Sequence, residues 1–538
     1  MVVPRLTWPA KAHGGAAHLL LLLLLHAATG SAAFARDAVA GAEVQAPAPA
    51  VNPCTSTALP AAAPVASWLS GAQGLAPLAL QLLRAAPEHG LDMRRYQVDE
   101  LTVRLAGPEG ASAAFVRDLD RAMVQYLCDL HGGRAAWASR VSAAPDTGFD
   151  PRKRLATVRD AQGLAQAIDA AVLAIPLYGR VKATLAQYRA LSLATPDWPA
   201  LPAVSRAAIH AGEPYAGAAM LQARLQLLGD LDAQVPMGSD GIYTPALAGA
   251  VRRFQARHGL DEDGVLGAAT VTALSVPPAH RIAQLALTLE RLRWLPPPPV
   301  HGRVVVVNVP TYRLWAFDAK DNFAAPALEM RVIVGARGRT PTPLFIGEMR
   351  YLEFAPYWNV PASIQKNEIV PKLARNPAYL QQNDMELVGS DGRVLQVGAG
   401  DAASRLQGGG ARVRQRPGPR NVLGDVKFAL PNPMNIYLHS TSARELFKRT
   451  HRDLSHGCIR VEQPAELAQF VLADPQQWSG AQVAAAMSAG KNRFVRLAEP
   501  VPVVLFYATA LVDREGRALF APDIYGRDAA LIAALQLE

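Results

Sequence analysis

Two histidines bracket one cysteine near the C-terminal end of the chain, at His439, His456 and Cys458. A thiolate attacks a carbonyl far better than a thiol does, and a free cysteine has a pKa of about 8.5, so a catalytic cysteine needs a base or a cation beside it. His456 is only two residues from Cys458, whereas His439 ends an expected strand and can face the thiol from a neighbouring strand. We therefore predict that Cys458 is a nucleophile and that His439 is its base.

The residues next to Cys458 suit the same chemistry. Gly457 has no Cβ, so a substrate carbonyl can approach the backbone closely, and the N–H groups of Gly457 and Cys458 can bind the negative charge that develops on it. If residues 458–461 form a strand, Cys458 and Arg460 share one face while Ile459 and Val461 point to the core. Arg460 then either fixes a substrate carboxylate or braces the loop.

Two other interpretations of this cluster stay open. Cys458 can be a buried structural cysteine, which is the more common role of a lone cysteine. His439, His451, His456 and Cys458 are all possible zinc ligands, although their spacing matches no usual zinc pattern. We expect no metal and no cofactor.

The elements around the cluster indicate a mostly β domain. After Pro296-Pro297-Pro298-Pro299, β-branched residues dominate and the apolar period becomes two, as in residues 304–309 and 328–334. Helical spacing returns from Val360 to about Leu387, and residues 398–420 are rich in Gly and Arg. We interpret residues 362–422 as an inserted helical cap with Gly408-Gly409-Gly410 as its mobile segment.

A smaller module precedes this domain at residues 206–278. Asp240-Gly241 and Asp263-Gly264 each form a turn that begins a helix, in a weak internal repeat. Thr244 is the expected cap and Pro245 the first helical residue, with Leu247, Val251 and Phe254 as the buried stripe. The segment resembles the three-helix peptidoglycan-binding module, and a helical spacer is the alternative. Residues 279–300 are expected to be a connecting helix and a proline linker.

The N-terminal part contains targeting and scaffold features. Arg5 and Lys11, the apolar run 16–25 and Ala33-Phe34-Ala35 form a secretory signal pattern over residues 1–35. An Ala- and Pro-rich linker (36–62) and a helical scaffold domain (63–205) follow. We expect export, no transmembrane anchor after cleavage, and a Cys54–Cys128 bridge that leaves Cys458 as the free thiol.

The formal net charge of +9 favours an anionic partner, and export makes nucleic acid an improbable one.

His439, fifteen intervening residues and Ser455-His456-Gly457-Cys458 together resemble the active-site motif of the L,D-transpeptidases, the YkuD-type catalytic domain. The likeness extends to residues 356–361, 423–428 and 523–528 and covers about residues 301–538. The order of the domains resembles the large multidomain periplasmic L,D-transpeptidases of Gram-negative bacteria. Many members of the family have asparagine two residues after the cysteine, where this chain has Arg460.

This resemblance implies a β-sandwich catalytic domain in a multidomain α+β protein. It also implies a Cys458 thioester with the third residue of a tetrapeptide stem, release of D-alanine, a 3-3 cross-link and acylation by carbapenems. The roles it implies are Cys458 as nucleophile, His439 as base, Gly457 with Cys458 as oxyanion site, and Ser440 as the carbonyl that orients the imidazole. Substrate contacts are expected at Tyr437, Trp358, His456 and Arg460, although Tyr437 and Trp358 can equally be core aromatics.

Two other functions compete with transpeptidation. If water resolves the thioester, the same site is a carboxypeptidase or an endopeptidase that cuts stems or links between proteins and the wall. If the cysteine is idle, the chain is a non-catalytic wall-binding protein. We expect peptidoglycan as the main partner in the periplasm, with other wall synthases or an outer-membrane lipoprotein as further candidates.

Overall fold

The computed structural model describes residues 68–69, 74–135, 149–204, 208–236, 241–321, 323–396 and 398–536. The predicted signal peptide, the Ala- and Pro-rich linker and Cys54 lie outside these residues, as does Asp240. The chain forms two compact units, one of residues up to Val300 together with Ala508–Glu538, and one of His301–Tyr507.

The N-terminal part of the first unit is helical, as predicted, with α1 (Ala76–Arg84), α2 (Val98–Ala106), α3 (Ala113–Gly132), α4 (Pro151–Ala156), α5 (Ala161–Ala171) and α6 (Pro176–Ala194). Ser112 caps α3 by accepting a hydrogen bond from the Phe115 N–H. Phe115, Leu119, Met123 and Leu127 of α3 recur every four residues and are all buried in one apolar core. Cys128 is disulfide-bonded and Cys458 is a free thiol.

Among the described residues, no single helix is long and apolar enough to cross a membrane, and only α5 with α6, bent by 106°, passes that test as a pair.

The small module consists of α7 (Ala218–Leu227), α8 (Pro245–Ala256) and α9 (Ala268–Leu274). Thr244 caps α8, Pro245 is its first residue, and Leu247, Val251 and Phe254 are buried, so these predictions are confirmed. The Gln255 side chain organises the second turn, because it accepts from the Gly264 N–H and donates to Asp263. Gly264 has a φ of 70°, and a Cβ there would lie 2.9 Å from the carbonyl oxygen of Ala248.

The C-terminal segment belongs to the first unit, where it packs on α10 (Pro278–Leu292). It contains β14 (Ala510–Val512), β15 (Ala518–Phe520) and α17 (Arg527–Leu535). Thr288 of α10 donates to the Ala510 carbonyl at 2.7 Å, and buried Arg291 pairs with Asp528 at 2.5 Å. Buried polar contacts with α10 therefore hold this segment in the first unit. The prediction that it belongs to the catalytic domain was wrong.

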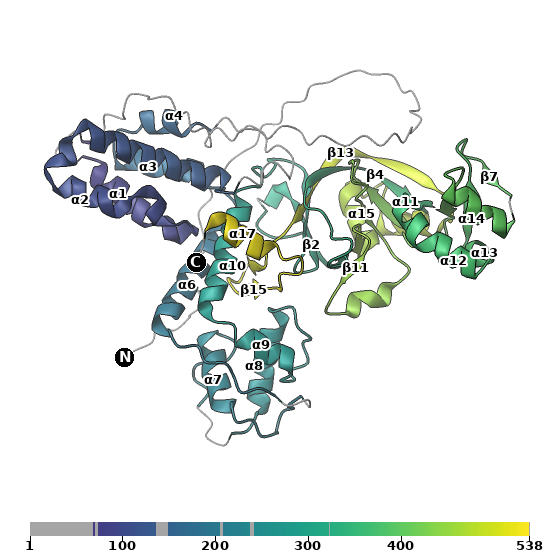
Figure 1. Ribbon diagram of the computed structural model, residues 1–538, viewed down its shortest axis with the longest axis horizontal. Helices are drawn as coiled ribbons and strands as arrows, with labels where there is room; N and C mark the ends of the chain where they lie inside the picture. Colours follow the sequence, from purple (N-terminus) through teal and green to yellow (C-terminus); the bar gives the residue numbers. More distant parts are fainter. Residues whose placement is uncertain are drawn as a thin grey trace. The chain divides into compact units, whose positions relative to one another are not determined.

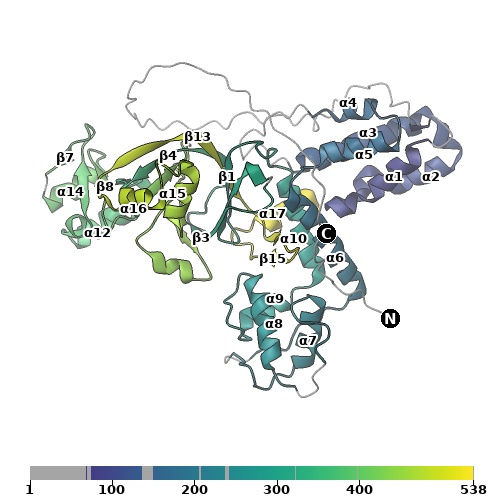
Figure 2. The same ribbon diagram turned by 180° about the vertical axis from the view of Figure 1, so that it is seen from behind.

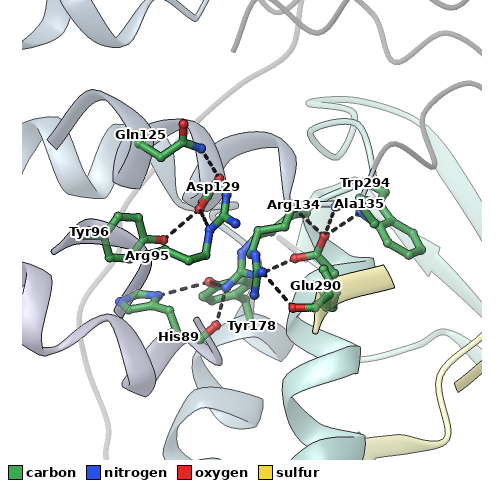
Figure 3. Close-up of polar contacts among 12 residues, drawn as sticks. His89, Arg95, Tyr96, Gln125, Asp129, Arg134, Ala135, Tyr178, Glu290 and Trp294 are labelled. Carbon is green, nitrogen blue, oxygen red and sulfur yellow. Dashed lines mark hydrogen bonds and ion pairs between the residues drawn. The ribbon is translucent and has the colours of Figure 1, made fainter. Parts of the chain in front are cut away.

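A buried polar network joins α10 to the N-terminal helices (Figure 3). The Glu290 carboxylate accepts hydrogen bonds from the backbone N–H groups of Arg134 and Ala135 at 2.6 and 2.9 Å, and from the Trp294 indole at 3.3 Å. It also pairs at 3.2 Å with Arg293, whose guanidinium donates to the His89 carbonyl and the Tyr178 hydroxyl. The Glu290 and Arg293 side chains are 2% and 0% exposed. The buried charges of Glu290 and Arg293 are therefore stable because they pair with each other and with these hydrogen-bonding groups.

Replacing Glu290 by alanine is expected to lower the free energy of unfolding of the first unit by about 3–5 kcal/mol, because the Arg293 charge would stay buried without its carboxylate. Chemical denaturation followed by circular dichroism measures this loss. Glu100→Ala is the matched control, since Glu100 is 62% exposed and its pair with Arg104 should contribute at most about 1 kcal/mol. Equal losses in both variants would contradict the prediction.

The second unit is built on a nine-stranded sheet in the order β11-β3-β12-β10-β9-β4-β13-β1-β2. Strand β2 pairs with both β1 and β3, so the sheet closes on itself. The strands predicted at 304–309 and 328–334 are confirmed as β1 and β3, and the domain is mostly β as expected. The bounds are β1 (Arg303–Asn308), β2 (Arg313–Asp318), β3 (Leu328–Gly335), β4 (Ile346–Phe354), β9 (Val426–Ala429), β10 (Leu438–His439), β11 (Asp453–Ser455), β12 (Ile459–Val461) and β13 (Arg493–Phe506).

Two helices of the second unit, α15 (Pro464–Leu472) and α16 (Gly480–Ser488), lie side by side (Figure 2).

The cap lies at one end of this sheet, where α12, α14 and β7 are grouped (Figure 1). Its helices are α11 (Ala362–Ile364), the π-helix η7 (Gln365–Ile369), α12 (Val370–Arg375), α13 (Tyr379–Gln382) and α14 (Ala399–Gln407). The prediction of a helical cap was incomplete, because β5 (Trp358–Asn359), β8 (Arg412–Gln415), β6 (Met385–Val388) and β7 (Val394–Leu395) form a four-stranded sheet there. These strands are two to four residues long, which is too short for a clear period of two.

Candidate active site

Neighbouring strands of the closed sheet bring the predicted residues onto one face. In β10, His439 lies opposite Arg460 of the parallel strand β12 and opposite Lys427 of the antiparallel strand β9. Tyr437 and Cys458 come two residues before His439 and Arg460, directly before the two strands, and the Ile459 N–H donates to the Tyr437 carbonyl at 3.1 Å. Side chains two residues apart on a strand share a face, so Cys458 lies on the face of His439.

Cys458 directly precedes β12, and its thiol is partly exposed. Its sulfur is 3.6 Å from the carbonyl oxygen of Asn435, which accepts the S–H. Burial raises the pKa of Cys458, while hydrogen bonding with Tyr437 and the charges of Lys427 and Arg460 lower it. Because burial dominates, the resting group is a neutral thiol.

The His439 imidazole is buried and neutral. Its Nδ1 lies 2.6 Å from the Ser440 carbonyl oxygen, which can only accept, so Nδ1 carries the proton and Nε2 has the free lone pair. Burial, followed by the charge of Arg460, lowers the pKa of His439 to about 3. The contacts of the described residues include no hydrogen bond between His439 and Cys458. The structure therefore brings His439 and Cys458 to one face with the imidazole already oriented.

The loop before Cys458 is fixed by two hydroxyl groups, that of Ser455 within the loop and that of Thr342 outside it. Ser455 donates to the Cys458 carbonyl at 2.6 Å and accepts from the Gly457 N–H at 3.1 Å, while Thr342 donates to the Gly457 carbonyl at 2.8 Å. Gly457 has a φ of 112°, which favours glycine. Its N–H is thus already engaged within the loop, and an oxyanion site at Gly457 and Cys458 requires that bond to be exchanged.

The loop that supplies the Asn435 carbonyl was not predicted from the sequence. The Asn432 side chain accepts from the N–H groups of Met434 and Ile436 at 3.0 and 3.2 Å and donates to the Ile436 carbonyl at 2.7 Å. Asn435 itself has a φ of 55°. Asparagine tolerates this conformation and closes such turns with its side chain, so Pro431-Asn432-Pro433 was the available signal.

Trp358 and Tyr437 both belong to the interior beside the thiol. Trp358 is 9% exposed in the apolar core of the cap, and Tyr437 packs against that core. Burial raises the pKa of Tyr437, as does the neighbouring Cys458 thiol, so its hydroxyl stays protonated. Trp358 is therefore a core aromatic, whereas Tyr437 is a core aromatic that also lies beside Cys458 on the neighbouring strand.

His456 and Arg460 occupy two different environments. The exposed His456 ring lies 2.5 Å from Glu368, which belongs to the π-helix η7 of the cap and also pairs with Lys372 at 3.5 Å. The Arg460 Nε is buried without a hydrogen-bond partner among the described residues. Across the same part of the chain, no group of three or more His, Cys, Asp or Glu is placed to hold a metal ion.

Replacing Glu368 by glutamine is expected to loosen the cap from the catalytic loop without unfolding the domain. Both groups are half-exposed, so their contact contributes at most about 1 kcal/mol. Hydrogen exchange should rise by up to about fivefold at residues 365–369 and 453–458, with the melting temperature nearly unchanged. Asp391→Asn, which changes an exposed cap carboxylate near Arg393, is the control. Unchanged exchange at both segments would show that the contact does not join them.

Comparison with protein families matches three parts of the chain. The model of the L,D-transpeptidase catalytic domain (YkuD) matches residues 302–501, which include Cys458 and His439. The model described as a "putative peptidoglycan binding domain" matches residues 216–274, and a scaffold domain model matches residues 66–185.

Similar proteins have the same description. A "Putative L,D-transpeptidase" of Haemophilus influenzae is 33% identical over 245 residues, which are 46% of this chain and 48% of the relative. The chain therefore spans about half the length of that curated relative. A solved L,D-transpeptidase structure (residues 123–326) from Xylanimonas cellulosilytica is 17% identical, with 56% of this chain and 99% of that chain covered and a TM-score of 0.16. Residues 302–501 of this chain are an L,D-transpeptidase catalytic domain of the YkuD family, joined in one polypeptide to a peptidoglycan-binding domain.

Proposed function

We propose that this protein is a peptidoglycan L,D-transpeptidase that forms 3-3 cross-links through a thioester on Cys458. The observation that supports this most directly is the shared face of Cys458 and His439 on adjacent parallel strands, with the imidazole tautomer set by the Ser440 carbonyl. The peptidoglycan-binding domain supports a wall polymer as the substrate.

In the first half-reaction, the Cys458 sulfur attacks the carbonyl carbon of the third stem residue, usually diaminopimelate. The C–N bond to the terminal D-alanine breaks, and the thiol proton leaves on the D-alanine amine. An imidazole with a pKa of about 3 does not hold this proton, so His439 relays it as the bond forms. The contact between base and thiol must tighten when substrate binds, as it does in many free enzymes.

In the second half-reaction, the side-chain amine of another stem attacks the thioester carbon. A new amide forms, the C–S bond breaks and the Cys458 thiol is restored with the proton that the amine loses. Arg460 lies beside His439 with an unsatisfied buried Nε, and we assign it to a carboxylate of the donor stem. The exposed His456 is assigned to the substrate entrance.

The rest of the chain suits this activity. The signal pattern of residues 1–35 would export the enzyme to the periplasm, and the net charge of +9 would favour the anionic wall. The peptidoglycan-binding domain would then raise the local concentration of stems at the thiol.

The test is incubation of the mature protein with a disaccharide-tetrapeptide, followed by mass spectrometry. The expected product is a dimer lighter than two substrates by one free alanine. A tripeptide product without dimer would show that water resolves the thioester. Binding without any product would overturn the proposal in favour of a wall-binding protein.

A further inference from the structure

The site face contains a cation that the proposed mechanism does not use. In register across four strands lie Glu353 of β4, Lys427 of β9, His439 of β10 and Arg460 of β12. The neutral imidazole thus has a cation on each side, and Lys427 has the Glu353 carboxylate as its neighbour on the next strand. Lys427 and Glu353 are 3.7 Å apart, and their side chains are 22% and 9% exposed.

Glu353 is held in place from a second direction. The Asn492 side chain donates to the Glu353 carboxylate at 3.0 Å and to the carbonyl oxygens of Phe354 and Ala355 at 3.4 and 3.1 Å. Asn492 directly precedes β13, the partner strand of β4. A carboxylate fixed in this way limits where the Lys427 ammonium can lie.

The Lys427 ammonium lies over the Tyr437 ring, with its nitrogen 4.7 Å from the ring centroid. A cation at this distance is attracted to the ring face. It also withdraws electron density from the phenol, which makes the hydroxyl a stronger hydrogen-bond donor. Tyr437 and Cys458 lie side by side, each directly before one of the paired strands β10 and β12, and the Ile459 N–H donates to the Tyr437 carbonyl at 3.1 Å. Hydrogen bonding by Tyr437 opposes the rise that burial causes in the pKa of Cys458.

We propose that Lys427, anchored by Glu353, is a positioning residue that stabilises the Cys458 thiolate through the ring and hydroxyl of Tyr437. This inference rests on the proposed role of Cys458 as the nucleophile. Lys427 itself touches neither the thiol nor the substrate, because its ammonium contacts Glu353 and the face of the Tyr437 ring. It lowers the cost of forming the thiolate when the substrate arrives.

Other charges also act on the thiol and have to stay constant in a test. Arg460 adds a second cation from the strand of Cys458, and Glu445 partly compensates it. Further titratable groups around the loop include His439 on β10, Asp453 on β11, His456 on the loop itself, and Glu368 with Lys372 from the cap.

The experiment measures the rate constant of Cys458 alkylation by iodoacetamide against pH, with the folded full chain. Lys427→Met should shift the profile to higher pH by about one unit, which is about a tenfold slower reaction at neutral pH. Lys427→Arg keeps the charge and should restore most of the rate. The exposed Lys448→Met is the matched control and should leave the profile unchanged.

Glu353→Gln provides a test of opposite sign. Removing this negative charge leaves the Lys427 cation uncompensated, so the profile should move to lower pH. A lysine that only supports packing would give shifts in the same direction for both variants, or none, and either result would overturn the proposal. If Lys427→Met does not fold, the direction of the Glu353→Gln shift decides alone.

Alkylation requires no wall substrate, so the two proposals fail separately. If the wild-type protein makes no dimer but the two variants shift the alkylation profile as expected, the proposed function is overturned and the role of Lys427 stands. With substrate, Lys427→Met should lower kcat by about tenfold and leave KM within about twofold, because the stem does not contact the ammonium.

Discussion

Replacing Cys458 by alanine should abolish both the thioester and the cross-linked dimer. The loss should be at least about 1000-fold and up to about 10⁶-fold, as for other covalent nucleophiles, because Cys458 supplies the sulfur of the thioester. Intact-protein mass spectrometry with a tetrapeptide stem, or with a carbapenem, measures the adduct directly. The wild-type protein should gain one acyl group and the variant none.

The variant should fold, since Cys458 is partly exposed and the contact of its sulfur with the Asn435 carbonyl is weak, at 3.6 Å. Ser442→Ala, at an exposed serine of the loop after His439, is the control and should keep full activity. Dimer formation by a folded Cys458→Ala protein would show that another group is the nucleophile.

Replacing His439 by glutamine should lower kcat by about 10²- to 10⁴-fold, the usual contribution of a general base. Glutamine keeps a donor for the Ser440 carbonyl but cannot relay the thiol proton to the leaving amine. Steady-state kinetics of D-alanine release measure the effect. Stem binding should persist, since the imidazole is buried and acts on the thiol rather than on the stem.

His451→Gln is the matched control, because His451 is exposed near the same loop and has no assigned role. Its kcat should equal that of the wild type. If both histidine variants lose activity equally, the effect comes from a disturbed loop and His439 is not the base.

The covalent inhibitors implied by the family likeness allow a further separation of the two variants. Cys458→Ala should form no adduct at any time, whereas His439→Gln should form the same adduct slowly. The two variants differ because the nucleophile is the atom that becomes acylated, whereas the base only accelerates the acylation.

The local features of the protein could be predicted from its sequence because they depend on residues close in the chain. Thr244 and Pro245 begin α8, and the alternation after Pro299 gives β1 and β3. The same period of two places Cys458 and Arg460 on one face of β12, with Ile459 and Val461 buried. The motif around Cys458 likewise indicated the nucleophile and its family.

The surroundings of the thiol depend on contacts between residues far apart in the sequence, and only the tertiary structure decides these. The closure of the sheet through β2 and β3, the Glu368 contact with His456 and the row from Glu353 to Arg460 follow from strand pairing and from the pairing of buried charges. Asp528 likewise joins the first unit because Arg291 is buried there and needs a carboxylate. The sequence by itself predicted Cys458 as the nucleophile, whereas the fold determined which charges surround it, because a buried charge is stable only beside the partners that the packed chain brings to it.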